Sequence, residues 1–269
     1  MLKVTFPDGD KKEYDKGITP LEIAQSISHS LAKRLLSASF NNKQIESSTK
    51  IIENGNIEFY FWDDVKGKHA FWHSSAHLFA QIILELYPKS KLTIGPPIDN
   101  GFYYDVDLGD KIISENDFEK IEKMMIDEAR KDHKFILRES SKKDALDFYK
   151  KNGNQYKTEL INDLNDEKIT FCDHANFSDL CKGGHIPSTG HIKAVKLLNV
   201  AGAYWRGDEK NKQLTRVYGI SFPKQKLLSE YLELIQEAKK TDNRVIGKQI
   251  KLFKYSNQVG HRLPLCHPK

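Results

Sequence analysis

Two short clusters in the sequence carry side chains that can do acid–base, nucleophilic or metal chemistry. The first is the run HSSAH, in which His73 and His77 stand four residues apart. On a helix this spacing places both imidazoles on one face. The second is the run CKGGH from Cys181 to His185, preceded by Asp179. Its two glycines let the backbone turn sharply, so that the thiol and the imidazole can face one point.

Each cluster alone has an ordinary structural explanation, but the combination favours a site. A histidine pair at this spacing is often a polar helix face, and a single cysteine is often a small buried residue. Together His73, His77, Cys181 and His185 would complete the tetrahedral ligand set of zinc. HSSAH lacks, however, the glutamate that an HExxH metalloprotease uses as its base. In the metal-free alternative, the histidines hold and activate a water while polar neighbours orient an ester. The residue types leave both chemistries open.

The composition is that of a soluble globular protein with room for two domains. The chain has 269 residues, of which 39% are hydrophobic and 29% charged. No stretch approaches the roughly 18 to 20 consecutive apolar residues of a membrane span, and the N-terminus turns polar too soon for a signal peptide. We therefore expect a cytoplasmic location and no membrane. Three scattered cysteines predict free thiols, and the net charge of +5 permits a polyanionic partner.

Residues 1–62 are expected to form a small β-grasp, or ubiquitin-like, domain. The run TPLE from Thr19 to Glu22 has the pattern of a helix start, and one apolar face continues to Leu31. Turns are expected on both sides of this helix, over 7–10 and 41–42. Alternating apolar residues and these turns predict strands over 2–6, 11–15 and 57–61.

Residues 63–223 are expected to form an α/β sandwich, because helices and strands are mixed there without a βαβ rhythm. A helix is predicted from Trp72 to Tyr87, stopped by Pro88. Further helices are expected over about 116–132 and from Ser140 to a stop at Gly153. The fold class is therefore α+β. The predicted strands of this domain run over 102–107, 167–172, 193–200 and 214–222.

The last part of the sequence predicts one amphipathic helix and little that could fold alone. This linker helix spans 224–241, with an apolar face that includes Leu227. Beyond it, Ile250 and Leu252 lie in strand-like fragments. We expect residues 242–269 to be the truncated start of a further domain.

Four runs of the sequence together carry a resemblance to a known family. They are HSSAHLFAQIILELYPKSKLTIGPPIDNGFYYDVD, FSDLCKGGH, the run AGAYWRGD over 201–208 and the LxRxYG run over 214–219. These runs closely resemble the editing domain of bacterial threonyl-tRNA synthetases. The related domain of alanyl-tRNA synthetases shares only the HxxxH and CxxxH skeleton. Residues 1–62 resemble the TGS domain of the same family. The run DNRVIGKQIKLF, after the linker helix, resembles the lead-in to its class II catalytic core.

This resemblance implies a site and shows one departure from the family's pattern. It implies that four residues form an editing pocket and that two others support it. The departure is Gly184, which stands where the family commonly has proline. We expect glycine to make this loop less rigid while the Cys–His spacing is kept. The pocket residues are His73, His77, Cys181 and His185, and the supporting residues are Lys157 and Asp179.

The function implied is hydrolysis of mischarged seryl-tRNA(Thr), carried out by the N-terminal portion of a threonine–tRNA ligase. The partner would be tRNA(Thr) charged with serine, with Arg206 and Arg216 as candidate contacts. No cofactor is expected for editing, and zinc at the four clustered residues is the alternative.

Other properties of the family would belong to the absent catalytic domain. These are ATP, magnesium and a structural zinc, so ligase activity is not expected from this chain alone, and a homodimer is expected only for the full-length protein. The remaining alternatives are a free-standing trans-editing deacylase, a non-catalytic RNA-binding or regulatory TGS protein, and a zinc hydrolase of a small molecule.

Overall fold

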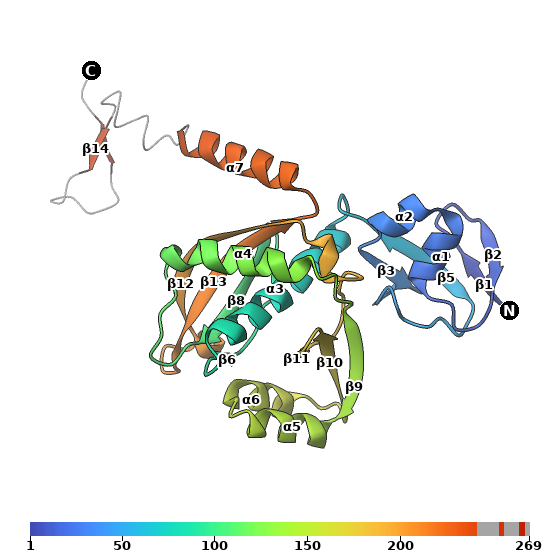
Figure 1. The fold of residues 1–269 in the computed structure, drawn as a ribbon, viewed down its shortest axis with the longest axis horizontal. Helices are drawn as coiled ribbons and strands as arrows, with labels where there is room; N and C mark the ends of the chain where they lie inside the picture. The colour runs from blue at the N-terminus through green and yellow to red at the C-terminus, as the bar shows by residue number, and fades with distance from the viewer. Residues whose placement is uncertain (241–252, 256–263, 267–269) are drawn as a thin grey trace. The chain divides into compact units, whose positions relative to one another are not determined.

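The computed structural model describes residues 1–240, 253–255 and 264–266. Met1–Lys224 form one compact unit, and the described part of Gln225–Lys269 belongs to a second. The fold is a mixed α/β arrangement in which an N-terminal ubiquitin-like domain precedes a domain of sheets and helices, and this confirms the predicted class (Figure 1). No helix within the described ranges combines the length and the apolar composition needed to cross a membrane.

The N-terminal domain is built on a five-stranded sheet with the order β2-β1-β5-β3-β4. β1 runs parallel to β5 and antiparallel to β2. The turn predicted over 41–42 joins β3 to β4, and both of its residues, Asn41 and Asn42, have the positive φ of a tight hairpin (50° and 64°). The strands are β1 (Leu2–Thr5), β2 (Lys11–Tyr14), β3 (Ser37–Phe40), β4 (Lys43–Ile45) and β5 (Gly55–Tyr60).

The helical segment of this domain starts as predicted but is divided in two. α1 (Pro20–Ile27) begins with a capping box between Thr19 and Glu22. The apolar face predicted to continue to Leu31 is interrupted at Ser28, whose backbone is extended (φ −166°). Because the Ser28 side chain accepts a hydrogen bond from the backbone N–H two residues on, it caps a separate helix, α2 (His29–Arg34).

The second domain is built around α3 (Val65–Leu86), which packs against an antiparallel sheet with the order β12-β13-β8-β6. α3 begins seven residues before the predicted start at Trp72, because Gly67 is helical rather than a break. A Cβ on Gly67 would lie 1.9 Å from the backbone oxygen of Phe61, so this glycine permits a close approach of two chain segments. Figure 1 shows α4 beside α3. The other elements of this layer are β6 (Lys91–Leu92), β7 (Pro97–Ile98), β8 (Gly101–Asp107), α4 (Phe118–Ala129), β12 (Ala194–Tyr204) and β13 (Gln213–Phe222).

The ends of two predicted elements in this layer are corrected by the structure. The helix predicted over about 116–132 starts with a 3-10 turn, and α4 ends at Ala129, three residues early. The strand predicted over 193–200 continues to Tyr204, because β12 pairs with β13, past a shift in register between Leu197 and Asn199, as far as Tyr204. Pairing partners therefore extend a strand beyond its own apolar pattern.

A smaller layer of three strands, in the order β11-β10-β9, packs against two short helices. The helix predicted from Ser140 begins two residues later, because Ser140 and Ser141 still belong to β9. The sequence does not predict β9, since this strand is mostly exposed and lacks an apolar alternation. The elements are β9 (Ile136–Ser141), α5 (Lys142–Lys151), α6 (Gln155–Asp163), β10 (Lys168–His174) and β11 (Phe177–Leu180).

Short turns and the C-terminal elements complete the described chain. The linker helix predicted over 224–241 is α7 (Gln225–Lys240). The strand-like fragments expected at positions 250 and 252 lie outside the described residues. The 3-10 turns are Glu115–Asp117, Thr189–His191 and Trp205–Gly207, and the last strands, which pair antiparallel, are β14 (Phe253–Tyr255) and β15 (Pro264–Cys266).

Candidate functional site

The first predicted cluster lies on the deeply buried part of α3. His73 and His77 are one helical turn apart, and their ring centroids are 5.0 Å from each other. The two serines between them hold the helix in place. Ser74 Oγ accepts a hydrogen bond from Ile186 N (3.0 Å), and Ser75 Oγ lies 2.7 Å from a serine oxygen of β13. The HSSAH run therefore both carries the imidazoles and anchors their helix.

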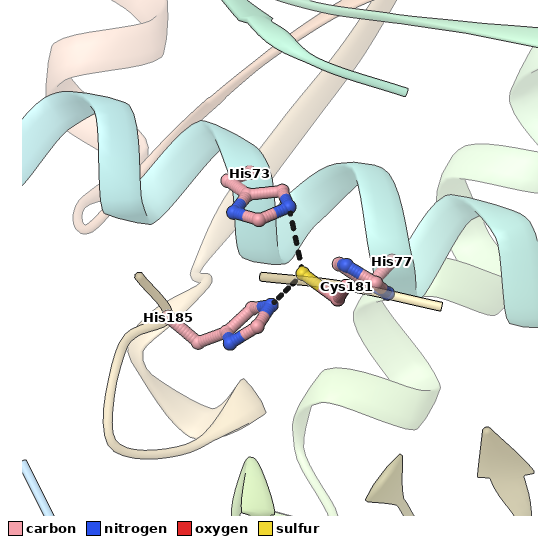
Figure 2. A group of neighbouring side chains, drawn as sticks. All are labelled: His73, His77, Cys181 and His185. Carbon is pink, nitrogen blue, oxygen red and sulfur yellow. Dashed lines mark hydrogen bonds between the residues drawn. The ribbon is translucent and has the colours of Figure 1, made fainter. Parts of the chain in front are cut away.

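The second predicted cluster reaches the same point from the end of β11. Gly183 and Gly184 have φ values of +99° and +88°, which residues with a Cβ rarely adopt. After this turn, His185 Nε2 lies 3.2 Å from Cys181 Sγ, and the same sulfur lies 3.3 Å from His73 Nε2 (Figure 2). The prediction that the two glycines bring thiol and imidazole to one point is confirmed.

The two clusters make one site. One ligand atom from each of His73, His77, Cys181 and His185 lies within 4.8 Å of the others. Three of these side chains are buried, and His73 is partly buried, so it is the most accessible member. Figure 2 shows the sulfur between the imidazoles of His73 and His185.

The protonation of the site is set by burial and by mutual contact. Burial alone would raise the pKa of the Cys181 thiol, but the neighbouring imidazoles of His73 and His77 and hydrogen bonds from His185 and His73 hold it well below its ordinary value. Burial alone would lower the pKa of His185, but hydrogen bonds with thiols and a carboxylate raise it well above its ordinary value. Burial lowers the pKa of His77. These directions favour a thiolate–imidazolium pair beside a neutral imidazole.

A further group, which the sequence does not predict, completes the hydrogen bonding of His185. Glu46, in the N-terminal domain, places Oε1 at 3.0 Å from His185 Nδ1. The same carboxylate accepts hydrogen bonds from Gly184 N (2.8 Å) and His185 N (3.2 Å). No spacing signal could have found this residue, because it precedes His185 by 139 positions.

The two supporting residues implied by the resemblance form a buried ion pair of their own. Lys157 Nζ, on α6, lies 2.7 Å from Asp179 Oδ1, on β11. Asp179 also accepts hydrogen bonds from the hydroxyls of Tyr104 and Tyr149, each at 3.0 Å. Asp179 and Cys181 are two residues apart and both buried, as residues on one face of an extended chain are. No pattern in the sequence marks the two tyrosines, so they are not among the predicted residues.

A further buried histidine, His174, lies next to the site. His174 is 2% exposed, and neither ring nitrogen has a hydrogen-bond partner within the described residues. Its ring centroid is 6.5 Å from that of His77. Burial, together with the charges of neighbouring histidines, lowers the pKa of His174 to about 3, so its ring is neutral at physiological pH.

The candidate tRNA-contacting arginines are both paired with carboxylates. Arg216 makes two hydrogen bonds to Asp105 (2.6 and 2.7 Å) and lies over the ring of Tyr103. Arg206 is exposed and pairs with Asp163. Of the two, Arg206 has the more accessible charge.

The donor set of the site also fits a metal centre. Three imidazole nitrogens and one sulfur are ligand types that zinc prefers, and a tetrahedral site needs donors about 2.0 to 2.3 Å from the ion. Donor atoms within 4.8 Å of one another are close enough to hold a metal. The residues present therefore fit zinc in type and in proximity.

Known proteins match this chain both by domain and along its whole length. Residues 2–60 match the TGS domain family, and residues 169–218 match the threonyl and alanyl tRNA synthetase second additional domain. Threonine–tRNA ligases are similar along the whole chain: 57% identical in Flavobacterium psychrophilum, 54% in Porphyromonas gingivalis and 51% in Cytophaga hutchinsonii. The chain spans 41–42% of the length of these relatives. It thus carries a TGS domain and a second additional domain, and it corresponds along its whole length to the N-terminal region of threonine–tRNA ligases.

Proposed function

We propose that this chain hydrolyses the ester that joins serine to the 3′ end of threonine tRNA. The observation that carries the proposal is the convergence of three imidazoles and a thiol, from α3 and from the CKGGH loop, on one point. The similarity to threonine–tRNA ligases supplies the substrate class. The chain would act as their editing portion.

The chemistry of serine and threonine explains why such a site is needed. Serine lacks one methyl group of threonine, and a pocket built for threonine rejects it by only about 1–3 kcal/mol, which is roughly 10- to 200-fold. A second site that hydrolyses seryl-tRNA multiplies this discrimination against serine by a further factor. The same methyl group then works in reverse, because its steric clash excludes correctly charged threonyl-tRNA.

The proposed reaction is attack of water on the ester carbonyl. The C–O bond to the terminal adenosine breaks, its oxygen takes up a proton, and serine and tRNA are released. We assign the water to His73 or His185: His73 can position or activate it, and His185, which is held protonated, can position it, directly or through the neighbouring 2′-hydroxyl. His73 is partly exposed and can meet solvent, whereas His185 is buried.

Lys157 and Asp179 are proposed to orient the substrate. The carboxylate of Asp179 already accepts from Lys157, Tyr104 and Tyr149. We therefore give Asp179 the role of holding Lys157 in place. An ammonium group has three N–H donors, so Lys157 retains further donors for a carbonyl or phosphate oxygen of the substrate.

Zinc is the second chemistry that a specific observation favours, because the four donors are close enough to hold it. His73, His77, Cys181 and His185 would be its ligands. With all four as ligands the tetrahedron would be closed, as in a structural zinc site, so lowering the pKa of a bound water would require one of the four to leave its position open. A chelator separates this possibility from metal-free hydrolysis.

A deacylation assay with seryl- and threonyl-tRNA tests the proposal. The chain should hydrolyse seryl-tRNA and spare threonyl-tRNA. His73→Ala and Cys181→Ala should each lower the rate by about 10²-fold or more, since a positioned acid–base group contributes 10²–10⁴-fold. A chelator should leave the rate unchanged in the metal-free chemistry and abolish it, with recovery on adding zinc, in the alternative.

His69→Ala is the matched control. His69 lies on α3 one turn before His73 and outside the four-residue cluster. Its substitution should leave the rate close to that of the wild-type chain, because His69 lies outside the proposed acid–base groups. Full seryl-tRNA hydrolysis in both His73→Ala and Cys181→Ala would refute the site.

The assay also separates the other candidate functions. A regulatory TGS protein would bind tRNA without cleaving the ester, and its binding would survive substitution of His73 and His77. A hydrolase of a small molecule would need no tRNA. Whether the chain acts within a longer ligase or in trans depends on the complete protein, and the ester chemistry is the same in both.

A further inference from the structure

Glu46 carries a buried carboxylate from one domain into the candidate site of the other. It directly follows β4 of the N-terminal domain and is 5% exposed. Placing a carboxylate in such surroundings is costly unless hydrogen bonds compensate for the lost water. Its partners come from the CKGGH loop: Gly184 N (2.8 Å), His185 N (3.2 Å) and His185 Nδ1 (3.0 Å).

The contact with His185 determines the direction of the imidazole. Nδ1–H donates to Glu46, which points Nε2 at Cys181 Sγ, 3.2 Å away. The imidazole thus bridges the carboxylate and the sulfur. A partner on one ring nitrogen determines the orientation and the proton of the other, as is common for histidines at reactive sites.

The loop is shaped for this carboxylate. Gly184 contributes a backbone N–H at φ +88°, where proline has neither the donor nor the conformation. A Cβ on Gly183 would stand 3.0 Å from Glu46 Oε1. Gly183 therefore leaves room for the side chain from the N-terminal domain, and Gly184 donates to it.

We propose that Glu46 is a positioning residue of the site, which orients His185 towards Cys181 and makes the site depend on the N-terminal domain. The inference rests on the proposed function for its kinetic consequence, though not for its structural one. Glu46 itself need not touch the substrate. It acts through His185.

The first test measures the imidazole directly and needs no activity. The full chain is labelled with nitrogen-15 in histidine, and the ring-nitrogen signals are assigned with His185→Gln. In the wild-type chain, His185 should carry a proton on Nδ1, and Glu46→Ala should change both of its ring-nitrogen signals. Glu46→Gln keeps an acceptor oxygen of nearly the same reach and should restore the wild-type signals in part.

The second test is kinetic. Glu46→Ala should lower kcat for seryl-tRNA hydrolysis about 10- to 100-fold, by analogy with the loss of the outer hydrogen-bond partner of a metal-ligating histidine. KM should stay nearly constant, because Glu46 does not touch the substrate, and Glu46→Gln should recover part of kcat. Glu53→Gln, an exposed glutamate of the same domain, is the control for a lost charge and should behave as wild type.

The outcomes distinguish the two proposals. Unchanged His185 signals in Glu46→Ala would overturn the positioning role, even with hydrolysis intact. Changed signals together with an unchanged kcat would overturn its kinetic part. A wild-type chain that does not hydrolyse seryl-tRNA would refute the proposed function, and the ring-nitrogen signals would still decide whether Glu46 orients His185. If Glu46→Ala does not fold, the near-isosteric Glu46→Gln and the shorter Glu46→Asp take its place, with an intermediate and a large effect expected respectively.

Discussion

At the scale of single residues, Cys172 and Cys181 differ sharply although both are buried and free. Burial acts on both thiols, but the imidazoles around Cys181 outweigh it and hold the pKa of that thiol well below its ordinary value. Burial raises the pKa of Cys172 to about 11. A thiolate rather than a thiol is the nucleophile. The reactivities of Cys172 and Cys181 should therefore differ more than their exposed fractions do.

Alkylation measures this difference. The pKa of Cys181 lies well below the ordinary thiol value, near 8.5, so its reaction with iodoacetamide should fall much less than that of an ordinary thiol as the pH is lowered below that value. Cys172 should remain protonated and unreactive until the pH approaches 11. Peptide mapping by mass spectrometry separates the sites. In urea the two should react alike, and preferential labelling of Cys172 in the folded chain would contradict the assignment.

The residue scale also shows which site residues the sequence predicts. His73, His77, Cys181 and His185 are predicted to meet from their types and spacing, and they do. Glu46 is not predicted, because a glutamate after a short, mostly exposed strand carries no local signal of burial.

At the scale of elements, the loop between β11 and the turn at Thr189 takes a backbone conformation that depends on glycine at position 184. The sequence predicts that Gly184 makes this loop less rigid than proline would. The structure adds a specific role, since Gly184 N donates to Glu46 from a φ of +88°. Two properties of glycine, its N–H and its conformational freedom, are therefore both in use.

Substitution of this glycine tests the loop. Gly184→Pro removes the donor and forbids the observed φ, so seryl-tRNA hydrolysis should fall about tenfold, the lower end of the range expected for loss of the Glu46 contact. Combined with Glu46→Ala, it should cost less than the product of the two single effects, because both act on one contact. Gly153→Ala is the control, since Gly153 also has a positive φ (+64°) but no neighbour within 4 Å. If the rate of the double variant instead falls by the full product of the two single effects, Gly184 acts independently of Glu46.

Element boundaries show which local patterns are reliable. The capping box at Thr19 predicts the start of α1 correctly, because its partners lie within four residues. Ser28 ends that helix early, and α3 starts before its predicted first residue and includes Gly67, since caps and close approaches depend on neighbours that a periodic pattern does not contain. The short elements α6, β9 and β11 are not predicted, and β9 in particular is mostly exposed and lacks an apolar alternation.

At the scale of the whole molecule, an aromatic cluster follows the N-terminal domain and packs into the second. The ring of Trp62 lies 5.0 Å from Phe71, 6.0 Å from Trp72 and 5.5 Å from Phe222, measured between centroids. These partners come from α3 and β13. The cluster connects the end of one domain to the layer that carries the histidines, in agreement with a single compact unit over Met1–Lys224.

Removing this ring should weaken the unit. Trp62→Ala should lower the free energy of unfolding by about 2–3 kcal/mol, below the roughly 3–5 kcal/mol typical of a fully buried Trp, because Trp62 is only partly buried. Trp62→Phe keeps an aromatic ring and should cost less. Urea unfolding followed by circular dichroism measures both. Equal stability of the wild-type chain and Trp62→Ala would show that the cluster does not hold the unit together.

What the sequence by itself determined was local or repetitive: the α+β class, the helix start at Thr19, and the four clustered residues whose spacing fits a helix and a sharp loop. Local patterns act within a few residues, so they can be read without a fold. What only the tertiary structure decided was which distant groups meet, including the pairing of Lys157 with Asp179 and the approach of Glu46 to His185. The buried carboxylate of Glu46 needs compensating hydrogen-bond donors, and those of His185 are 139 positions away in the chain. Only the packing of one domain on the other brings these groups into contact.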